Sequence, residues 1–266
     1  MTQDAQERVI GIEPLEASHE ALTMAPAQTL KVAAITPFTT IDFPGKLSAV
    51  VFIQGCPWRC VYCQNPWMQP SDFDPNYVHD SWEKVEQLLK RRKGLLDAVV
   101  FSGGEPCVDP ALPEAIKAAK NMGYAVGLHT GGIVPKRLEA ILPMLDWVGL
   151  DVKAPPLDVA RYEHVTGRKH AAERFLESFR MIQASGVKLE CRTTSHPDYL
   201  PEESLMQLAH WLHDEGVTTF ALQIYRRPNG GLFQALPAVD ADYPSPAALA
   251  ELREMFPNFI ERRNDR

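Results

Sequence analysis

Short apolar segments alternate with segments of helical periodicity along most of this chain. The runs LSAVVFIQ (47–54) and DAVVF (97–101) are rich in β-branched residues, which is typical of buried parallel strands. Between them, apolar residues recur at helical spacing: Trp82, Val85, Leu88 and Leu89. The pattern predicts a strand, a helix and a second strand in this part of the chain.

The same alternation continues to residue 225. Further apolar runs predict strands at 124–130, 147–153, 187–194 and 218–225. Helices are expected near 134–144, 171–184 and 202–214, and a last one from Ser245 as N-cap, with Pro246 at the first helical position, to about Phe256. Six strands joined by right-handed crossovers predict an α/β fold, either an open doubly wound sheet or a partial barrel. In both, functional loops follow the C-terminal ends of the strands.

The chain divides into three predicted parts. Residues 1–28 are rich in Ala, Glu, Gln and Thr without a sustained apolar period, so we expect a loose N-terminal extension. Residues 29–230 form the predicted core domain, and residues 231–266 a C-terminal tail with one helix. A chain of 266 residues is long enough for one such large domain.

Charge and hydropathy exclude several classes of protein. Lys and Arg number 27 against 34 Asp and Glu, a net charge of −7, so there is no overall positive field to attract nucleic acid. No apolar run approaches the roughly 18 to 20 residues that span a bilayer, and the N-terminus lacks the pattern of a signal peptide. We therefore expect a cytoplasmic protein that binds neither nucleic acid nor membrane. Its five cysteines are then more suited to metal binding than to disulfides.

Three of those cysteines lie in the segment GCPWRCVYCQNP (55–66), at Cys56, Cys60 and Cys63, with the spacing C-x3-C-x2-C. The segment follows the first predicted strand, and its glycine and prolines favour a loop over a helix that packs three cysteines on one face. Three thiolates on one tight loop suit a cubane iron–sulfur cluster that lacks a fourth protein ligand and leaves one iron open.

Other ligand sets remain open for this loop. A zinc site could be completed by a histidine such as His79, although structural zinc sites usually use paired C-x2-C hooks and no second hook exists. Cys107 and Cys191 could each supply a fourth thiolate. Cys191 lies inside an apolar strand, where packing is the more natural role.

Three further motifs follow predicted strands and should meet the cysteine loop at the same edge of the sheet. They are SGGEPC (102–107), HTGG (129–132) and DVKAP (151–155). Gly103 and Gly104 allow a close approach of backbone to a ligand, and Glu105 adds a carboxylate, although the same residues could form an ordinary tight turn. Asp151 and Lys153 share one face of a strand, as a plain ion pair or as ligand contacts.

These motifs together resemble the radical S-adenosylmethionine superfamily, with Tyr62 before the last cysteine and GGEP one strand later. More closely, TPFTTIDFPGKLSAVVFIQGCPWRCVYCQNP (36–66), FSGGEP and LDVK are similar to the activating enzymes of anaerobic ribonucleotide reductase and of pyruvate formate-lyase. The resemblance covers about residues 30–225. It implies a partial (β/α)6 barrel of the radical S-adenosylmethionine type.

The resemblance also implies the site. Cys56, Cys60 and Cys63 would hold a four-iron, four-sulfur (4Fe-4S) cluster, and S-adenosylmethionine would chelate its fourth iron. The Tyr62 backbone would meet the adenine. The other residues expected to contact the cofactor are Ser102, Gly103, Gly104, Glu105, Thr130, Asp151 and Lys153. Among these, the GGE segment would receive the methionine amino group, and the Asp and Lys would hold the carboxylate end or the ribose.

The implied reaction is reductive cleavage of S-adenosylmethionine to methionine and a 5′-deoxyadenosyl radical, which takes hydrogen from a glycine Cα of a partner enzyme. The expected partner is anaerobic ribonucleoside-triphosphate reductase, with a flavodoxin- or ferredoxin-like protein as electron donor. The alternatives are a pyruvate formate-lyase-type activase, a radical enzyme acting on a small molecule or RNA, and a non-radical zinc or redox-sensing protein. The acidic balance argues against the RNA version.

The sequence departs from the formate-lyase activases at two places. His129 opens the loop HTGG where those enzymes have an aspartate in DTNG, which removes a carboxylate from that position. The histidine that they place near the end of the sixth strand is missing, and Tyr225, Arg226 and Arg227 stand there instead. With only three cysteines in the loop and no cysteine-rich insert, a second cluster is not expected.

Overall fold

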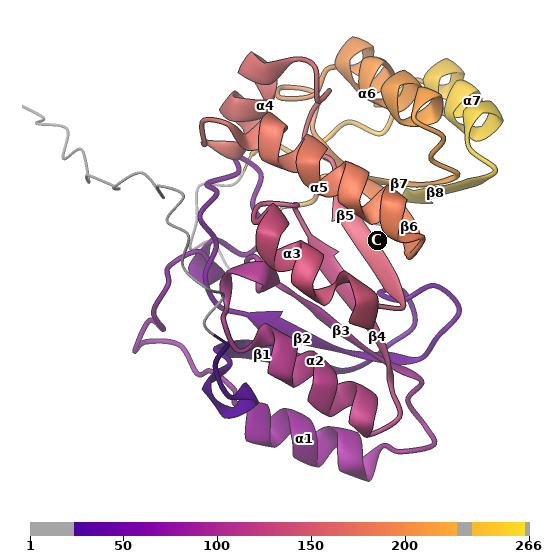
Figure 1. Ribbon diagram of the computed structural model, residues 1–266. Helices are drawn as coiled ribbons and strands as arrows, with labels where there is room; N and C mark the ends of the chain where they lie inside the picture. The colour runs from indigo at the N-terminus through magenta and orange to yellow at the C-terminus, as the bar shows by residue number, and fades with distance from the viewer. Residues whose placement is uncertain (1–23, 228–235, 264–266) are drawn as a thin grey trace, which may run out of the picture.

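The computed structural model describes residues 24–227 and 236–263, and these residues form one eight-stranded sheet with helices packed along it (Figure 1). The strands are β1 (Val32–Thr39), β2 (Ser48–Ile53), β3 (Ala98–Gly103), β4 (Ala125–Thr130), β5 (Trp147–Asp151), β6 (Lys188–Ser195), β7 (Thr219–Ile224) and β8 (Asn258–Arg262). They lie in chain order, β1 antiparallel to β2 and every later pair parallel. In the described residues β1 and β8 do not pair with each other, so the barrel stays open.

Helices connect the parallel strands in the order that crossover connections require. They are α1 (Trp82–Arg91), α2 (Leu112–Asn121), α3 (Pro135–Ile141), α4 (Val159–Thr166), α5 (Ala171–Ser185), α6 (Glu202–Asp214) and α7 (Pro246–Met255). Figure 1 shows α1, α2, α3 and α5 lying in sequence order along the strands. The protein therefore has an α/β fold with a partial barrel, and the doubly wound alternative is wrong.

The six strands predicted from apolar runs are confirmed as β2 to β7, and the predicted helices as α1, α3, α5, α6 and α7. Two strands and two helices were missed. Strand β1 contains a proline and is half-exposed at its C-terminal end, and strand β8 is largely polar. Neither has the sequence pattern of a buried strand. Helix α2 buries only Leu112 and Ile116 besides two alanines, and α4 is only 8 residues long. In all four, packing against neighbouring elements stabilises a strand or helix whose own sequence pattern is weak.

The two ends of the chain add to the predicted core. Residues 1–23 of the predicted extension lie outside the described residues, but Ala27 is buried in a short 3₁₀ helix (Ala27–Thr29), and the Ala25 N–H donates to the Pro110 carbonyl at 3.1 Å. After residue 230 the structure has the expected helix α7, whose N-cap Ser245 accepts from the Ala248 N–H, and it adds β8 to the sheet. The boundaries of the three-part division stay a prediction.

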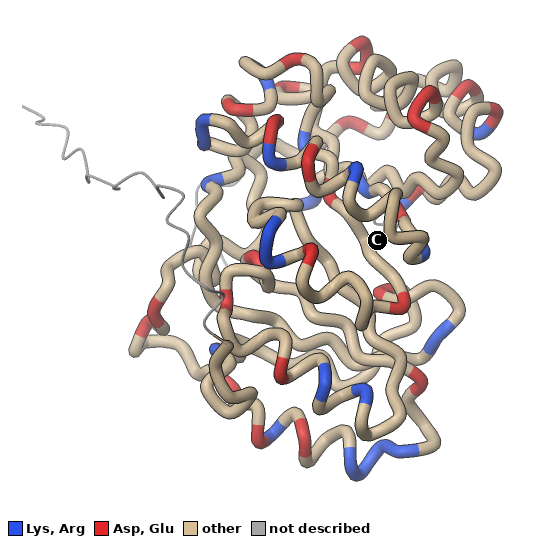
Figure 2. Tube along the Cα trace, viewed as in Figure 1, with Lys and Arg blue, Asp and Glu red and all other residues tan. Residues whose placement is uncertain are grey.

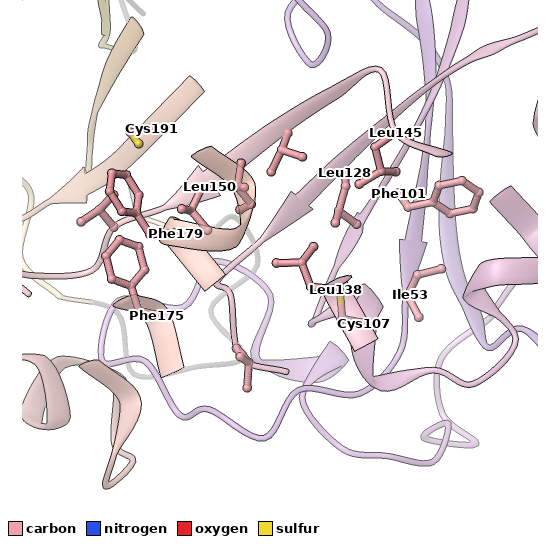
Figure 3. Packing of buried hydrophobic residues seen from close by; sticks show 14 of the residues in the cluster. Ile53, Phe101, Cys107, Leu128, Leu138, Leu145, Leu150, Phe175, Phe179 and Cys191 are labelled. Carbon is pink, nitrogen blue, oxygen red and sulfur yellow. The ribbon is translucent and has the colours of Figure 1, made fainter. Parts of the chain in front are cut away.

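The two faces of the sheet bury different side chains. The outer face packs under the helices, where Phe101, Leu128 and Leu150 lie among buried residues that include Phe179 (Figure 3). On the inner face a small separate cluster joins residues near the N-terminal ends of the strands: Phe43, Val50, Ala98, Val100 and Trp147. Because this cluster fills the inner face near the start of the strands, the polar side chains near their C-terminal ends are left to form a site.

Charge is mixed over the molecule. Figure 2 shows Lys and Arg interspersed with Asp and Glu along the trace, in keeping with the acidic balance of the sequence. None of the helices in the described part of the chain combines the length and hydropathy needed to cross a membrane.

Candidate functional site

The cysteine loop leaves the C-terminal end of β2 and is held there by backbone and side-chain hydrogen bonds. The Cys56 N–H donates to the Gln69 carbonyl at 3.0 Å. The buried Gln54 side chain donates to the carbonyls of Trp67 (3.1 Å) and Pro70 (2.9 Å). The two ends of the loop are thus tied together, and its three cysteines are free thiols that are partly exposed.

The other side of the loop packs on α4, one of the two helices that the sequence did not predict. The Arg59 N–H donates to the Thr166 carbonyl at 2.8 Å, and the Val61 N–H donates to the Val165 carbonyl at 3.0 Å. The Arg59 guanidinium turns back to the Cys56 carbonyl at 2.6 Å. Helix α4 therefore fixes the middle of the cysteine loop, where its end carbonyls accept the N–H groups of a neighbouring segment.

The GGE segment after β3 approaches the cysteine loop so closely that side chains are excluded. A Cβ on Gly103, whose φ is +114°, would lie 2.4 Å from the Ile53 nitrogen. A Cβ on Gly104 would lie 2.3 Å from the Gly55 carbonyl oxygen, and the Glu105 N–H donates to that same oxygen at 2.8 Å. The two glycines are therefore required by the packing of one loop on the other, independently of any ligand.

Glu105 is fully buried and surrounded by donors. Its carboxylate accepts hydrogen bonds from the Thr130 hydroxyl (2.8 and 2.9 Å), the Gly131 N–H (2.9 Å) and the Cys107 N–H (3.1 Å). Burial raises the pKa of Glu105, and these hydrogen bonds oppose that shift. Thr130, predicted as a cofactor contact, donates to the Glu105 carboxylate and does not line the cavity described below, so its contact with a cofactor stays a prediction.

Asp151 at the end of β5 lies between two cations. Its carboxylate is 3.0 Å from the Lys153 ammonium and 3.3 Å from the Arg192 guanidinium. Burial opposes ionisation of Asp151, but the charges of Lys153 and Arg192 outweigh it and lower its pKa to about 2. Lys153 in turn lies over the ring of Tyr62, 5.8 Å from the ring centroid. The predicted Asp–Lys pair is thus part of a three-charge cluster of net charge +1.

His129 lies on the inner face of β4 and contacts Arg192 of this cluster. Its Nδ1 is 3.1 Å from the Ser102 hydroxyl, and its Nε2 is 3.0 Å from Nη1 of Arg192. Burial and the nearby Arg192 charge lower the pKa of His129 well below its usual value, so the ring is neutral. The hydrogen-bonded imidazole connects β3, β4 and β6.

A cavity of ≈ 210 Å³ joins these elements at the C-terminal ends of the strands. All predicted site residues except Thr130 line it: Cys56, Cys60, Tyr62, Cys63, Ser102, Gly103, Gly104, Glu105, Asp151 and Lys153. The sequence analysis missed the remaining lining residues, which are Trp58, Gln64, Asn65, Gln69, Gly131, Ile133, Arg192, Thr194 and Gln223. Arg192 and Gln223 could have been found, since each is a polar residue in the second half of a predicted strand, near the edge where the motifs were expected to meet.

The other candidate metal ligands lie away from this cavity. Cys107 and Cys191 are buried in the apolar core (Figure 3), and Cys107 lines a separate cavity of ≈ 180 Å³ beside α2 and α3. His79 stacks on Phe73 at 3.9 Å and does not line the cysteine cavity. Within the described ranges, no three His, Cys, Asp or Glu side chains converge as a single metal ion would require.

The donor set fits a cluster with three protein ligands. Burial, with the Glu105 charge, raises the pKa of the Cys56 thiol to about 12, and burial raises that of Cys60 to about 11, so both are protonated without metal. Iron binding must release these protons, because thiolate is the form that ligates metal. A cluster spreads its ligands over several irons, so three thiols around one cavity satisfy it without meeting at a point.

Comparison with known proteins agrees with this geometry. Residues 50–216 match the Radical SAM superfamily. A protein of Methanocaldococcus jannaschii named as a glycyl-radical enzyme activating enzyme is 31% identical over 189 residues, which cover 69% of this chain and 75% of the relative. The pyruvate formate-lyase-activating enzyme of Clostridium pasteurianum is 32% identical over 197 residues, covering 68% of this chain and 75% of the relative.

Solved structures share the fold. A radical SAM methyltransferase from Sphaerobacter thermophilus superposes with a TM-score of 0.61 at 14% identity, covering 86% of this chain and 69% of that one. SuiB of Streptococcus suis, bound to its precursor peptide SuiA, gives 0.60 at 16%, covering 81% of this chain; the chain spans about half (48%) of the length of SuiB. At these identities the likeness concerns the fold, but the match over residues 50–216 and the two relatives carry the family: this chain belongs to the radical S-adenosylmethionine superfamily.

Proposed function

We propose that this protein is the activating enzyme of a glycyl-radical enzyme, with anaerobic ribonucleoside-triphosphate reductase as its partner. The observation that carries the proposal is the single cavity that joins the three cysteines, the GGE segment and the Asp151–Lys153 pair. Two activating-enzyme relatives at 31% and 32% identity, each matched over three-quarters of its length, support the reaction class.

In this proposal Cys56, Cys60 and Cys63 would hold a 4Fe-4S cluster at which S-adenosylmethionine would bind. The reduced cluster would supply the electron for reductive cleavage, and S-adenosylmethionine would supply the 5′-deoxyadenosyl group that receives a glycine hydrogen. The protein contributes position and shielding. The loop carrying the cysteines is fixed by β2 and α4, so the three thiols are held in place before the cluster and the cofactor bind.

The roles of the remaining residues follow from their chemistry. The carbonyls and carboxylate of the GGE segment suit the cationic amino group of the methionine moiety, and the Lys153 ammonium suits its carboxylate. The Tyr62 backbone and the Ser102 hydroxyl are available for the adenosine. Thr130 acts indirectly, because its hydroxyl holds the Glu105 carboxylate in place.

A protein substrate is favoured by the open barrel. In the described residues the edge strands β1 and β8 do not pair, and a barrel open on one side can admit a loop that carries a glycine. The electron would come from a flavodoxin- or ferredoxin-like donor. The second candidate, a pyruvate formate-lyase-type partner, is favoured by the Clostridium pasteurianum relative.

The test is radical transfer to a defined partner. Anaerobically reconstituted protein is reduced and supplied with S-adenosylmethionine together with an anaerobic ribonucleotide reductase or, in parallel, a formate-lyase-type enzyme. The proposal expects a glycyl-radical doublet by electron paramagnetic resonance on the reductase. A signal on the formate-lyase-type enzyme alone would transfer the assignment to that partner. A signal on neither, despite steady cofactor cleavage, would point to a small-molecule substrate.

A further inference from the structure

The guanidinium of Arg192 lies in a space that the fold keeps open for it. A Cβ on Gly149 would lie 2.7 Å from Cη2 of Trp147, 3.1 Å from Cζ of Arg192 and 3.1 Å from Cδ2 of His129. Glycine at this position of β5 therefore leaves room for the Trp147 ring and for the Arg192 side chain, which crosses the inner face of the sheet from β6. Its side chain is only 9% exposed, so the charge is fixed within the protein at the wall of the cavity.

His129 holds one edge of this guanidinium. A guanidinium can only donate, so Nε2 of His129 accepts from Nη1 of Arg192 at 3.0 Å, and the Nδ1–H donates to the Ser102 hydroxyl. The Asp42 carbonyl lies 3.1 Å from Nε2 and could accept a hydrogen bond only from the opposite tautomer, in which Nε2 carries the proton. We assign the first tautomer, because an N–H directed at a buried cation would be repelled by it.

Asp151 is shared between Arg192 and Lys153. Its Oδ1 atom faces Nε and Nη2 of Arg192 at 3.3 Å, and its Oδ2 atom accepts from the Lys153 ammonium at 3.0 Å. In this arrangement Lys153 is occupied by a carboxylate of its own chain. If Lys153 were the sole partner of Asp151, a ligand carboxylate that bound Lys153 would take this partner away. Asp151 would then be a half-buried charge without a partner, which is costly.

We propose that Arg192 is a positioning residue that neutralises Asp151 and so frees Lys153 to bind the carboxylate group of S-adenosylmethionine. The inference rests on the proposed function. Three features support it: the net charge of +1 on the Asp151, Lys153 and Arg192 cluster, the place of both cations on the cavity wall, and the fixed seat of Arg192 against Gly149 and His129.

The experiment measures binding, not turnover. Reconstituted protein is titrated with S-adenosylmethionine and with decarboxylated S-adenosylmethionine, which lacks only the carboxylate. The carboxylate would also take part in chelating the iron, so the contact with Lys153 is measured as the change in the ratio of the two affinities between the wild type and a variant. The variants are Arg192→Met and the double variant Asp151→Asn/Arg192→Met, in which no carboxylate competes for Lys153. Iron content and circular dichroism check that each variant is intact.

We expect the wild type to prefer the carboxylated ligand by tenfold or more, as for a charge-assisted contact. Arg192→Met should lose most of this preference with little change for the decarboxylated ligand, and the double variant should regain it. An unchanged preference in Arg192→Met would overturn the inference. So would a loss that the double variant does not restore, because Arg192 would then bind the ligand itself or serve only the fold.

Two further outcomes separate this inference from the proposed function. If the wild type binds neither ligand, the proposed function fails; if it binds both equally, the carboxylate contact fails and the inference with it. Should Arg192→Met not fold, Arg192→Lys tests the same point. A lysine offers one ammonium in place of a fork, so it should lower the preference and be rescued by Asp151→Asn in the same way.

Discussion

The hydroxyl of Thr130 lies 2.8 and 2.9 Å from the two carboxylate oxygens of Glu105. This contact joins the loop after β3 to the loop after β4. Since the Glu105 N–H donates to Gly55 in turn, the cysteine loop, the GGE segment and the HTGG loop form one hydrogen-bonded unit. The site is therefore a property of three loops together.

Removing the Thr130 hydroxyl should loosen this unit. In Thr130→Val, a fully buried carboxylate loses one donor, which should lower the free energy of unfolding by about 1.5–3 kcal/mol, as for hydrogen bonds to charged groups. Denaturant unfolding measures the change. The matched control is Thr218→Val at an exposed position, which should change stability by less than about 0.5 kcal/mol. Equal effects of the two substitutions would contradict the role given to Thr130.

The cysteines of the loop should alone determine iron binding. Protein reconstituted without oxygen should bind about four irons and four sulfides per chain. Cys56→Ala, Cys60→Ala or Cys63→Ala should abolish this, because these three cysteines line the cavity and Cys107 and Cys191 do not. Cys107→Ala and Cys191→Ala are the controls, and both should retain the iron. Stoichiometric zinc without iron uptake would defeat the cluster assignment.

Lys153 should act on cofactor binding and not on the cluster. Lys153→Ala should weaken the binding of S-adenosylmethionine about ten- to a hundredfold, the cost of one charge-assisted contact, while iron content stays intact. Isothermal titration measures the affinity. Lys84→Ala, which removes a surface ammonium paired with Asp80, is the control and should bind normally. Normal binding of S-adenosylmethionine by Lys153→Ala would show that the end of β5 is not part of the binding site.

His129 should make the protein less stable in mild acid. Burial and the Arg192 charge hold its pKa well below the unfolded value of about 6.5, so the unfolded chain binds a proton first as pH falls. The contribution to stability is complete above about pH 6.5 and is lost below it, by at most about 1.4 kcal/mol per pH unit. Comparing unfolding at pH 7 and pH 5 tests this. His129→Gln should flatten the slope, whereas the exposed-site control His170→Gln should not.

Much of this site could be predicted from the sequence because its residues follow strands that are easily recognised. The apolar runs of β2 to β5 place the cysteine loop, SGGEPC, HTGG and DVKAP at one edge, and the structure brings them to one cavity except for the Thr130 side chain. Gly103 and Gly104 also stood out, although the Cβ positions show that loop packing alone would require them.

The rest depends on contacts between distant segments. Arg192 is a charged residue in the strand VKLECRTT, and nothing local reveals that Gly149 on the neighbouring strand makes room for it. Thr130 was predicted to contact a cofactor, and the sequence does not indicate its hydrogen bond to Glu105, which lies 25 residues away. The strands β1 and β8 were missed for the same reason, since each is stabilised by a neighbour more than by its own pattern.

The proposed activity is the removal of a hydrogen atom from a glycine of a partner enzyme. It is tested most directly with a partner reductase made with glycine deuterated at Cα, incubated with the reconstituted, reduced protein and unlabelled S-adenosylmethionine. The 5′-deoxyadenosine formed is then examined by mass spectrometry. We expect one deuterium in that product, together with the glycyl-radical signal on the partner. Unlabelled 5′-deoxyadenosine, formed at the same rate with and without partners of either glycyl-radical class, would contradict it.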